Sequence, residues 1–155
     1  MSKVLSILGS TGSIGRQTLS CVDQLGLSVC ALTAGSNVGR MEAQCRKYRP
    51  RLAVMATDAA AQDLKTRLVD LPIEVASGAE GLLAAATMAE ADTVVTAVMG
   101  MVGLQPTLAA IAEKKRIALA NKETLVCAGE LVMAAAREHG AEIVPVDSEH
   151  SAIFQ

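Results

Sequence analysis

A regular alternation of short apolar runs with longer segments of helical period constrains the fold of this sequence most strongly. Several of the apolar runs contain no polar residue that would face solvent, so strands formed by them must be covered on both faces. The alternation therefore predicts an α/β fold in which helices cover both faces of a parallel sheet. The expected strands are 3–8, 28–34, 51–55, 73–76, 93–98, 116–120 and 142–146, and the expected helices are 13–25, 38–48, 58–69, 79–88, 104–115 and 122–139.

Composition narrows the class of protein. The 155 residues suit one domain with its own core, and that core must be aliphatic because Tyr48 and Phe154 are the only aromatic residues. A net charge of −2 and the lack of aromatics argue against nucleic-acid binding. No stretch approaches the ~20 apolar residues of a membrane span. Four scattered cysteines indicate reduced thiols, so we expect a cytoplasmic protein with no membrane partner.

A glycine-rich turn, GSTGSIG at residues 9–15, lies between the first expected strand and the first expected helix. Glycines let a backbone approach a diphosphate closely, and a helix N-terminus supplies free N–H groups and a partial positive charge. The spacing is a variant of the dinucleotide-binding fingerprint, and no Gly-Lys-Ser/Thr follows that would indicate a Walker A loop. A plain strand-to-helix turn is the structural alternative.

The end of the second expected strand favours NADP(H) over NAD(H). A carboxylate at this position would bind the 2′-hydroxyl of NAD, yet no acidic residue occurs between Asp23 and Glu42. Ser36, Asn37 and the nearby Arg40 make a neutral to basic setting that tolerates a 2′-phosphate. Ser36 and Asn37 also suit helix capping, and both roles are compatible.

Two later segments carry polar residues at the ends of expected strands, where ligands bind in open parallel sheets. Asn121 and Lys122 follow one strand, where the chain enters the next helix, although Asn121 also suits a helix N-cap. Asp147 and Glu149 follow the last strand and offer oxygen ligands to a divalent cation such as Mg²⁺ or Mn²⁺. A role for these acids in complementing a helix dipole stays open.

Four strings in this order closely resemble the N-terminal half of the 1-deoxy-D-xylulose 5-phosphate reductoisomerase family. They are GSTGSIG at 9–15, AGSN at 34–37, ANKETLV at 120–126 and PVDSEHSAIFQ at 145–155. The resemblance extends over the whole chain. It implies an NADPH- and metal-dependent enzyme that converts 1-deoxy-D-xylulose 5-phosphate to 2-C-methyl-D-erythritol 4-phosphate in non-mevalonate isoprenoid biosynthesis.

The resemblance also implies roles for residues at matching positions. Contacts to the cofactor diphosphate would come from the glycine turn. Contacts to the adenosine ribose and 2′-phosphate would come from the segment after the second expected strand. The segment after the sixth expected strand would supply further cofactor contacts. The cofactor residues are Thr11, Gly12, Ser13, Ile14, Gly35, Ser36, Asn37, Asn121 and Glu123. Lys122 and Ser148 would meet a phosphorylated sugar, and Asp147 and Glu149 would ligate the metal, with Glu149 also touching the substrate.

The same resemblance predicts how the chain is organised. Residues 1–146 would form a Rossmann-like NADPH-binding domain, and 147–155 would begin a catalytic domain whose remainder, with a third metal ligand, follows residue 155. We expect such a chain to bind NADPH without turnover, and we expect the full-length protein to be a homodimer. Two alternatives are another NADP-dependent reductase domain and a non-catalytic dinucleotide-binding module.

Overall fold

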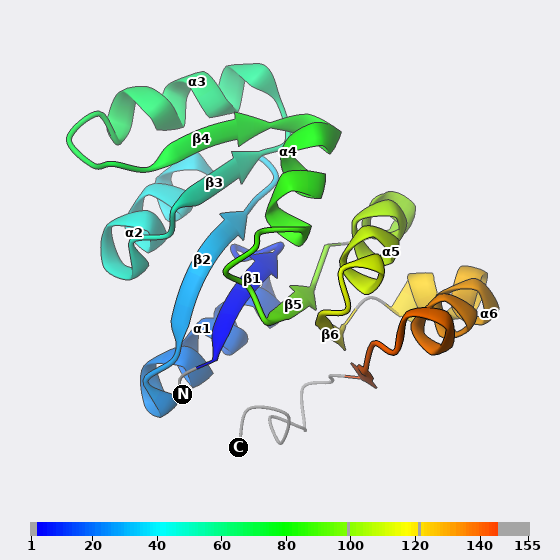
Figure 1. The fold of residues 1–155 in the computed structure, drawn as a ribbon. Helices are drawn as coiled ribbons and strands as arrows, with labels where there is room; N and C mark the ends of the chain where they lie inside the picture. The colour runs from blue at the N-terminus through cyan, green and yellow to red at the C-terminus, as the bar shows by residue number, and fades with distance from the viewer. Residues whose placement is uncertain (1–2, 99, 121, 146–155) are drawn as a thin grey trace.

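The computed structural model describes residues 3–98, 100–120 and 122–145. Strands and helices alternate through these residues, as expected (Figure 1). The strands are β1 (Val4–Leu8), β2 (Ser28–Thr33), β3 (Leu52–Met55), β4 (Glu74–Ser77), β5 (Thr93–Thr96), β6 (Arg116–Leu119) and β7 (Ile143–Pro145). The helices are α1 (Ser13–Leu25), α2 (Val38–Tyr48), α3 (Asp58–Arg67), α4 (Gly78–Ala86), the 3₁₀ turn η1 (Gly100–Gly103), α5 (Leu104–Ala112) and α6 (Lys122–His139).

The described strands form one parallel sheet in the order β4-β3-β2-β1-β5-β6-β7. The chain builds outward from β1 to β4, crosses the sheet, and builds outward again from β5 to β7. The strand order therefore reverses between β1 and β5, and such a switch point opens a crevice at the carboxyl ends of the strands. The prediction of a parallel sheet is confirmed.

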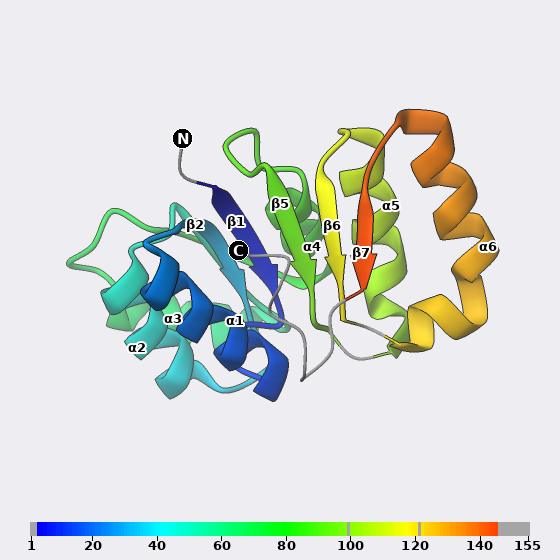
Figure 2. The same ribbon diagram turned by 90° about the horizontal axis from the view of Figure 1, so that it is seen from below.

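Helices cover both faces of the sheet, as Figure 2 shows: α1, α2 and α3 lie on one face and α4, α5 and α6 on the other. Two aliphatic core clusters correspond to these faces. In β5, Val95 packs in the cluster of α1–α3, whereas Val94 packs in the cluster of α4–α6. Both valines are fully buried, which explains why the strand is apolar on both sides.

Apart from element ends that shift by up to three residues, the structure departs from the expected elements in two places. The turn η1, between β5 and α5, has no counterpart in the sequence pattern. The predicted helix 122–139 is kinked at Ala128, whose backbone (φ −137°, ψ 24°) is not helical. None of the helices in the described part of the chain combines the length and hydropathy needed to span a bilayer.

Candidate dinucleotide-binding site

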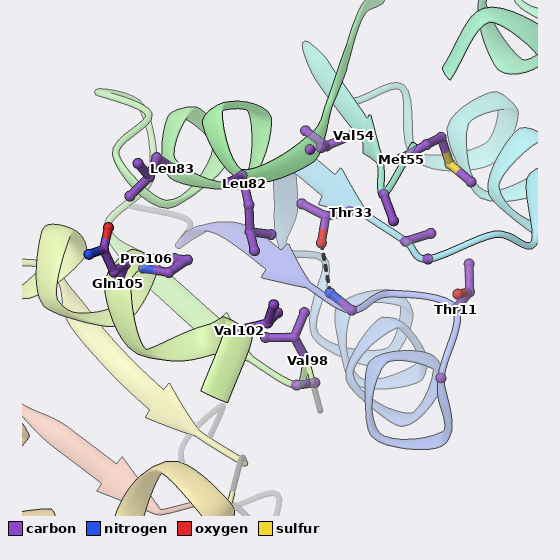
Figure 3. Close-up of a pocket in the computed structure, with 18 residues that line it drawn as sticks. Thr11, Thr33, Val54, Met55, Leu82, Leu83, Val98, Val102, Gln105 and Pro106 are labelled. Atoms are coloured by element: carbon purple, nitrogen blue, oxygen red, sulfur yellow. Dashed lines mark hydrogen bonds between the residues drawn. The ribbon is translucent and has the colours of Figure 1, made fainter. Parts of the chain in front are cut away.

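The turn between β1 and α1 is built around Gly9, which adopts a left-handed backbone conformation (φ 90°). A Cβ atom at this residue would lie 2.7 Å from the carbonyl oxygen of Ala97, so the turn sits directly against the end of β5. The Gly9 N–H donates to the Thr33 hydroxyl at 2.9 Å (Figure 3). The first glycine therefore makes the tight turn and lets β1, β2 and β5 meet at the switch point.

Gly15 lets helix α1 pack closely on the same turn. A Cβ atom at Gly15 would lie 2.6 Å from the Cα of Ser10, a separation that real Cβ atoms essentially never show. The obstructing atoms belong to backbone, which cannot rotate away. The third glycine thus brings the N-terminus of α1 onto the turn, as in other dinucleotide-binding helices.

Gly12, the middle glycine, faces open space. It is the N-cap of α1, it lines the cleft described below, and the nearest atom to a Cβ placed there is 3.9 Å away. No side chain caps this helix end. The first-turn N–H groups, which have no partner within a helix, are therefore available to an anion beside Gly12.

The segment after β2 forms the neighbouring wall. Gly35, Ser36 and Asn37 are exposed. Asn37 Oδ1 accepts a hydrogen bond from the Arg40 N–H at 3.0 Å, so Asn37 caps α2, as its residue type predicted. This bond uses only the amide oxygen of Asn37. The Asn37 NH₂ group and the Ser36 hydroxyl remain suitable donors for a ligand.

A groove between α1 and α2 gives this side of the site its charge. Arg16, Arg40 and Lys47 line the groove together with one acid, Asp23. Lys47 donates to Asp23 at 2.9 Å, and this hydrogen bond lowers the pKa of the Asp23 carboxyl. The ion pair neutralises the acid, which leaves the two arginines to attract an anion.

A cleft of about 620 Å³ extends from the glycine turn across the switch point. Figure 3 shows residues of α4 and α5 on one side of it and Thr11 of the glycine turn on the other. Its walls are mainly apolar and suit a flat ring next to a charged group. They include Val54, Met55, Leu82, Leu83, Val102, Gln105 and Pro106.

Sequence reasoning missed these apolar walls. Leu82 and Leu83 lie on α4, and Val102 lies on η1, all far along the chain from the glycine turn. The available signal was indirect: these helices follow strand ends, and the carboxyl ends of parallel strands share one edge of the sheet.

The remaining predicted residues belong to the sequence strings at 120–126 and 145–155. Lys122 and Glu123 form the beginning of α6, which follows β6 at the same edge of the sheet as the glycine turn. Asn121, Asp147, Ser148 and Glu149 lie outside the described residues. Within the described ranges, no three His, Cys, Asp or Glu residues are grouped to hold a metal ion.

The doubly wound sheet and the three glycines at its switch point define a Rossmann-like dinucleotide-binding domain. The family model of 1-deoxy-D-xylulose 5-phosphate reductoisomerase matches residues 5–129. The chain therefore belongs to the 1-deoxy-D-xylulose 5-phosphate reductoisomerase family, as the sequence strings predicted.

Curated relatives of that name are similar over the whole chain. The one from Heliobacterium modesticaldum is 60% identical over 159 residues, covering 100% of this chain and 41% of the relative. One from Desulfitobacterium hafniense is 56% identical over 155 residues, covering 99% and 41%. The chain thus spans about 41% of the length of these relatives.

Solved structures agree with this assignment. The Zymomonas mobilis reductoisomerase in complex with NADPH has a TM-score of 0.91 at 44% identity, covering 100% of this chain and 41% of that one. A reductoisomerase in complex with magnesium has a TM-score of 0.92 at 42% identity, covering 99% and 39%. A biliverdin reductase from Synechocystis has a TM-score of 0.58 at 14% identity, covering 92% of this chain and 37% of that one. At this level of identity, the likeness shows the fold alone.

Proposed function

We propose that this chain is the NADPH-binding part of an enzyme that converts 1-deoxy-D-xylulose 5-phosphate to 2-C-methyl-D-erythritol 4-phosphate. One observation carries the proposal: in a member of this family, the open Gly12 and the uncapped N-terminus of α1 face the cleft at the switch point. The space at Gly12 fits a diphosphate, because an anion there would meet amides without a side chain in the way. NADPH supplies the hydride of the reaction when it is bound.

The cofactor would lie along the edge of the sheet in a definite order. The amides of the glycine turn would hold the diphosphate, the segment after β2 would hold the ribose and 2′-phosphate, and the apolar walls would cover the adenine ring. The diphosphate and ribose roles fall on Thr11, Gly12, Ser13, Ile14, Gly35, Ser36 and Asn37. A preference for NADPH over NADH is supported by the exposed Ser36 and by the two arginines of the adjoining groove.

The substrate and metal residues of the proposal come from the family strings. Asn121 and Glu123 would contact the cofactor, and Lys122 and Ser148 would contact the phosphorylated sugar. The start of α6 at the shared edge of the sheet supports this placement. Asp147 and Glu149 would hold a hard divalent cation, Mg²⁺ or Mn²⁺, because carboxylate oxygens suit such ions, and Glu149 would also touch the substrate.

Three further properties complete the proposal: the domain bounds, the oligomeric state and the location in the cell. Residues 1–146 would form the NADPH-binding domain, and 147–155 would begin the catalytic domain. The full-length protein would be a homodimer. A cytoplasmic location is supported by the free thiols of Cys21, Cys30 and Cys45 among the described residues.

A fluorescence titration of the chain with NADPH and, in parallel, with NADH tests the cofactor assignment. We expect saturable NADPH binding and about tenfold weaker NADH binding, a difference of roughly 1.4 kcal/mol. No binding of either cofactor to the folded chain would refute the proposal for these residues. NADPH oxidation measured with 1-deoxy-D-xylulose 5-phosphate and Mn²⁺ tests whether the chain binds cofactor without turnover.

The two alternatives predict different behaviour toward metal. A non-catalytic dinucleotide-binding module, or another NADP-dependent reductase domain, has no use for a cation at Asp147 and Glu149. Substrate-dependent metal binding that is lost in Asp147→Asn would favour the reductoisomerase over both alternatives. Isothermal titration with Mn²⁺ in the presence and absence of substrate makes the comparison.

A further inference from the structure

The glycine turn is held from behind by a side chain of α2. Ser10 lies in a loop and yet has no exposed surface, and its hydroxyl donates to Oε1 of Gln44 at 2.7 Å. In return, Nε2 of Gln44 donates to the Ser10 carbonyl oxygen at 2.9 Å. Gln44 follows Ser10 by 34 residues and is only 8% exposed. The two residues thus form a reciprocal, buried pair of hydrogen bonds.

Ser10 separates the anchored part of the turn from the open part. Its N–H donates to the Thr33 carbonyl at 2.7 Å, and the Gly9 N–H lies 3.2 Å from the same oxygen. The next residues, Thr11 and Gly12, line the cleft. The Ser10 carbonyl is therefore the last firmly bonded group before the residues proposed to meet the diphosphate. A buried carbonyl without a partner is unfavourable, so this bond restrains the turn.

We propose that Gln44 is a positioning residue that holds the glycine turn in the shape required for diphosphate binding. This inference rests on the proposed function of the turn. Gln44 is not among the residues that line the cleft; it faces the groove between α1 and α2 and acts through Ser10. Because NADPH and NADH share the diphosphate, Gln44 contributes equally to the binding of both cofactors.

Gln44 could instead serve only to fill the core, and two variants separate these roles. Gln44→Met keeps an unbranched side chain of similar length but removes both polar atoms. Gln44→Glu keeps an acceptor for the Ser10 hydroxyl and, when ionised, has no donor for the Ser10 carbonyl; protonation restores the donor. The other titratable groups of the groove are present in every variant, so their effects cancel against the wild type. They are Arg16, Asp23, Arg40, Lys47 and Tyr48.

The first test measures the dissociation constants of NADPH and NADH by fluorescence from neutral to mildly acidic pH. We expect Gln44→Met to raise the dissociation constants of both cofactors roughly tenfold, equivalent to about 1.4 kcal/mol. The ratio of the two dissociation constants should not change. Gln44→Glu is expected to bind weakly at neutral pH and to recover as the pH falls. Gln62→Glu, on the exposed surface of α3, is the matched control and should bind like the wild type. Wild-type affinity in Gln44→Met would overturn the proposal, because that variant introduces no charge.

Hydrogen exchange in the absence of cofactor provides a second, independent readout. Amides of residues 9–12 should exchange faster in Gln44→Met than in the wild type, while those of Val94 and Val95 in β5 should not change. Unchanged exchange in the turn, or equal acceleration in β5, would overturn the positioning role. A wild-type chain that binds neither cofactor would refute the proposed function, and the exchange result would still decide the role of Gln44.

Discussion

The glycine turn permits a substitution that separates cofactor binding from folding. Gly12→Ala places a methyl group where the backbone has φ −79° and ψ 179°, a conformation that alanine adopts, and where the nearest atom is 3.9 Å away. Alanine is a poorer N-cap than glycine by up to about 1 kcal/mol, and it restricts the unfolded chain by about 0.4–1 kcal/mol. These effects oppose each other. The free energy of unfolding should therefore change by less than about 0.5 kcal/mol.

The same methyl group should impair NADPH binding, because it occupies the approach to the first-turn amides of α1. Losing one hydrogen bond to a charged phosphate costs about 1.5–3 kcal/mol. That range corresponds to a rise in the dissociation constant of roughly 10- to 150-fold. The effect should be similar for NADH, since the diphosphate is common to both cofactors.

Gly15→Ala is the contrasting variant. Its methyl group would lie 2.6 Å from the Ser10 Cα, so α1 and the turn must move apart. Overpacking of this kind costs about 3 kcal/mol. At about 2–4 °C per kcal/mol for a chain of this size, the unfolding midpoint should fall by roughly 6–12 °C.

Thermal unfolding followed by circular dichroism, together with the fluorescence titration, distinguishes the two variants. Gly12→Ala should keep the wild-type unfolding midpoint and bind NADPH more weakly, whereas Gly15→Ala should unfold at a lower midpoint. A midpoint for Gly12→Ala as low as that of Gly15→Ala, or unchanged NADPH affinity in Gly12→Ala, would refute the assignment of separate roles to these glycines.

Three further predictions concern the surroundings of the turn. Arg40→Ala should weaken NADPH binding several-fold and leave NADH binding unchanged. Equal losses of affinity in titrations with the two cofactors would contradict a role at the 2′-phosphate. The hydrogen bond from Lys47 lowers the pKa of the Asp23 carboxyl below its ordinary 3.8, so its contribution to stability is complete above that value and is lost as the pH falls through the folded-state pKa. The free energies of unfolding of Asp23→Asn and the wild type, measured with denaturant across this pH range, should therefore converge at low pH. Burial raises the pKa of the Cys45 thiol to about 12, and mass spectrometry after brief alkylation of the native chain should find Cys21 modified ahead of Cys45.

The sequence by itself determined the fold class and the family. Val94 and Val95 are consecutive apolar residues of one strand, and this pattern already required cover on both faces, which the structure supplies. Local chemistry was equally informative at the start of α2, where Asn37 caps the helix through the N–H three residues along. Such features depend on neighbours in the chain, so spacing and residue type are enough to predict them.

Only the tertiary structure decided which residues surround the glycine turn. The strand order places β5 beside β1 and so sets Ala97 against Gly9, and it brings Leu82 of α4 into the cleft. The bonds between Ser10 and Gln44 likewise depend on how α2 packs on the sheet. Periodicity shows which face of an element is buried but does not specify its partner. Contacts between distant segments therefore follow from strand order and helix packing, which no local pattern encodes.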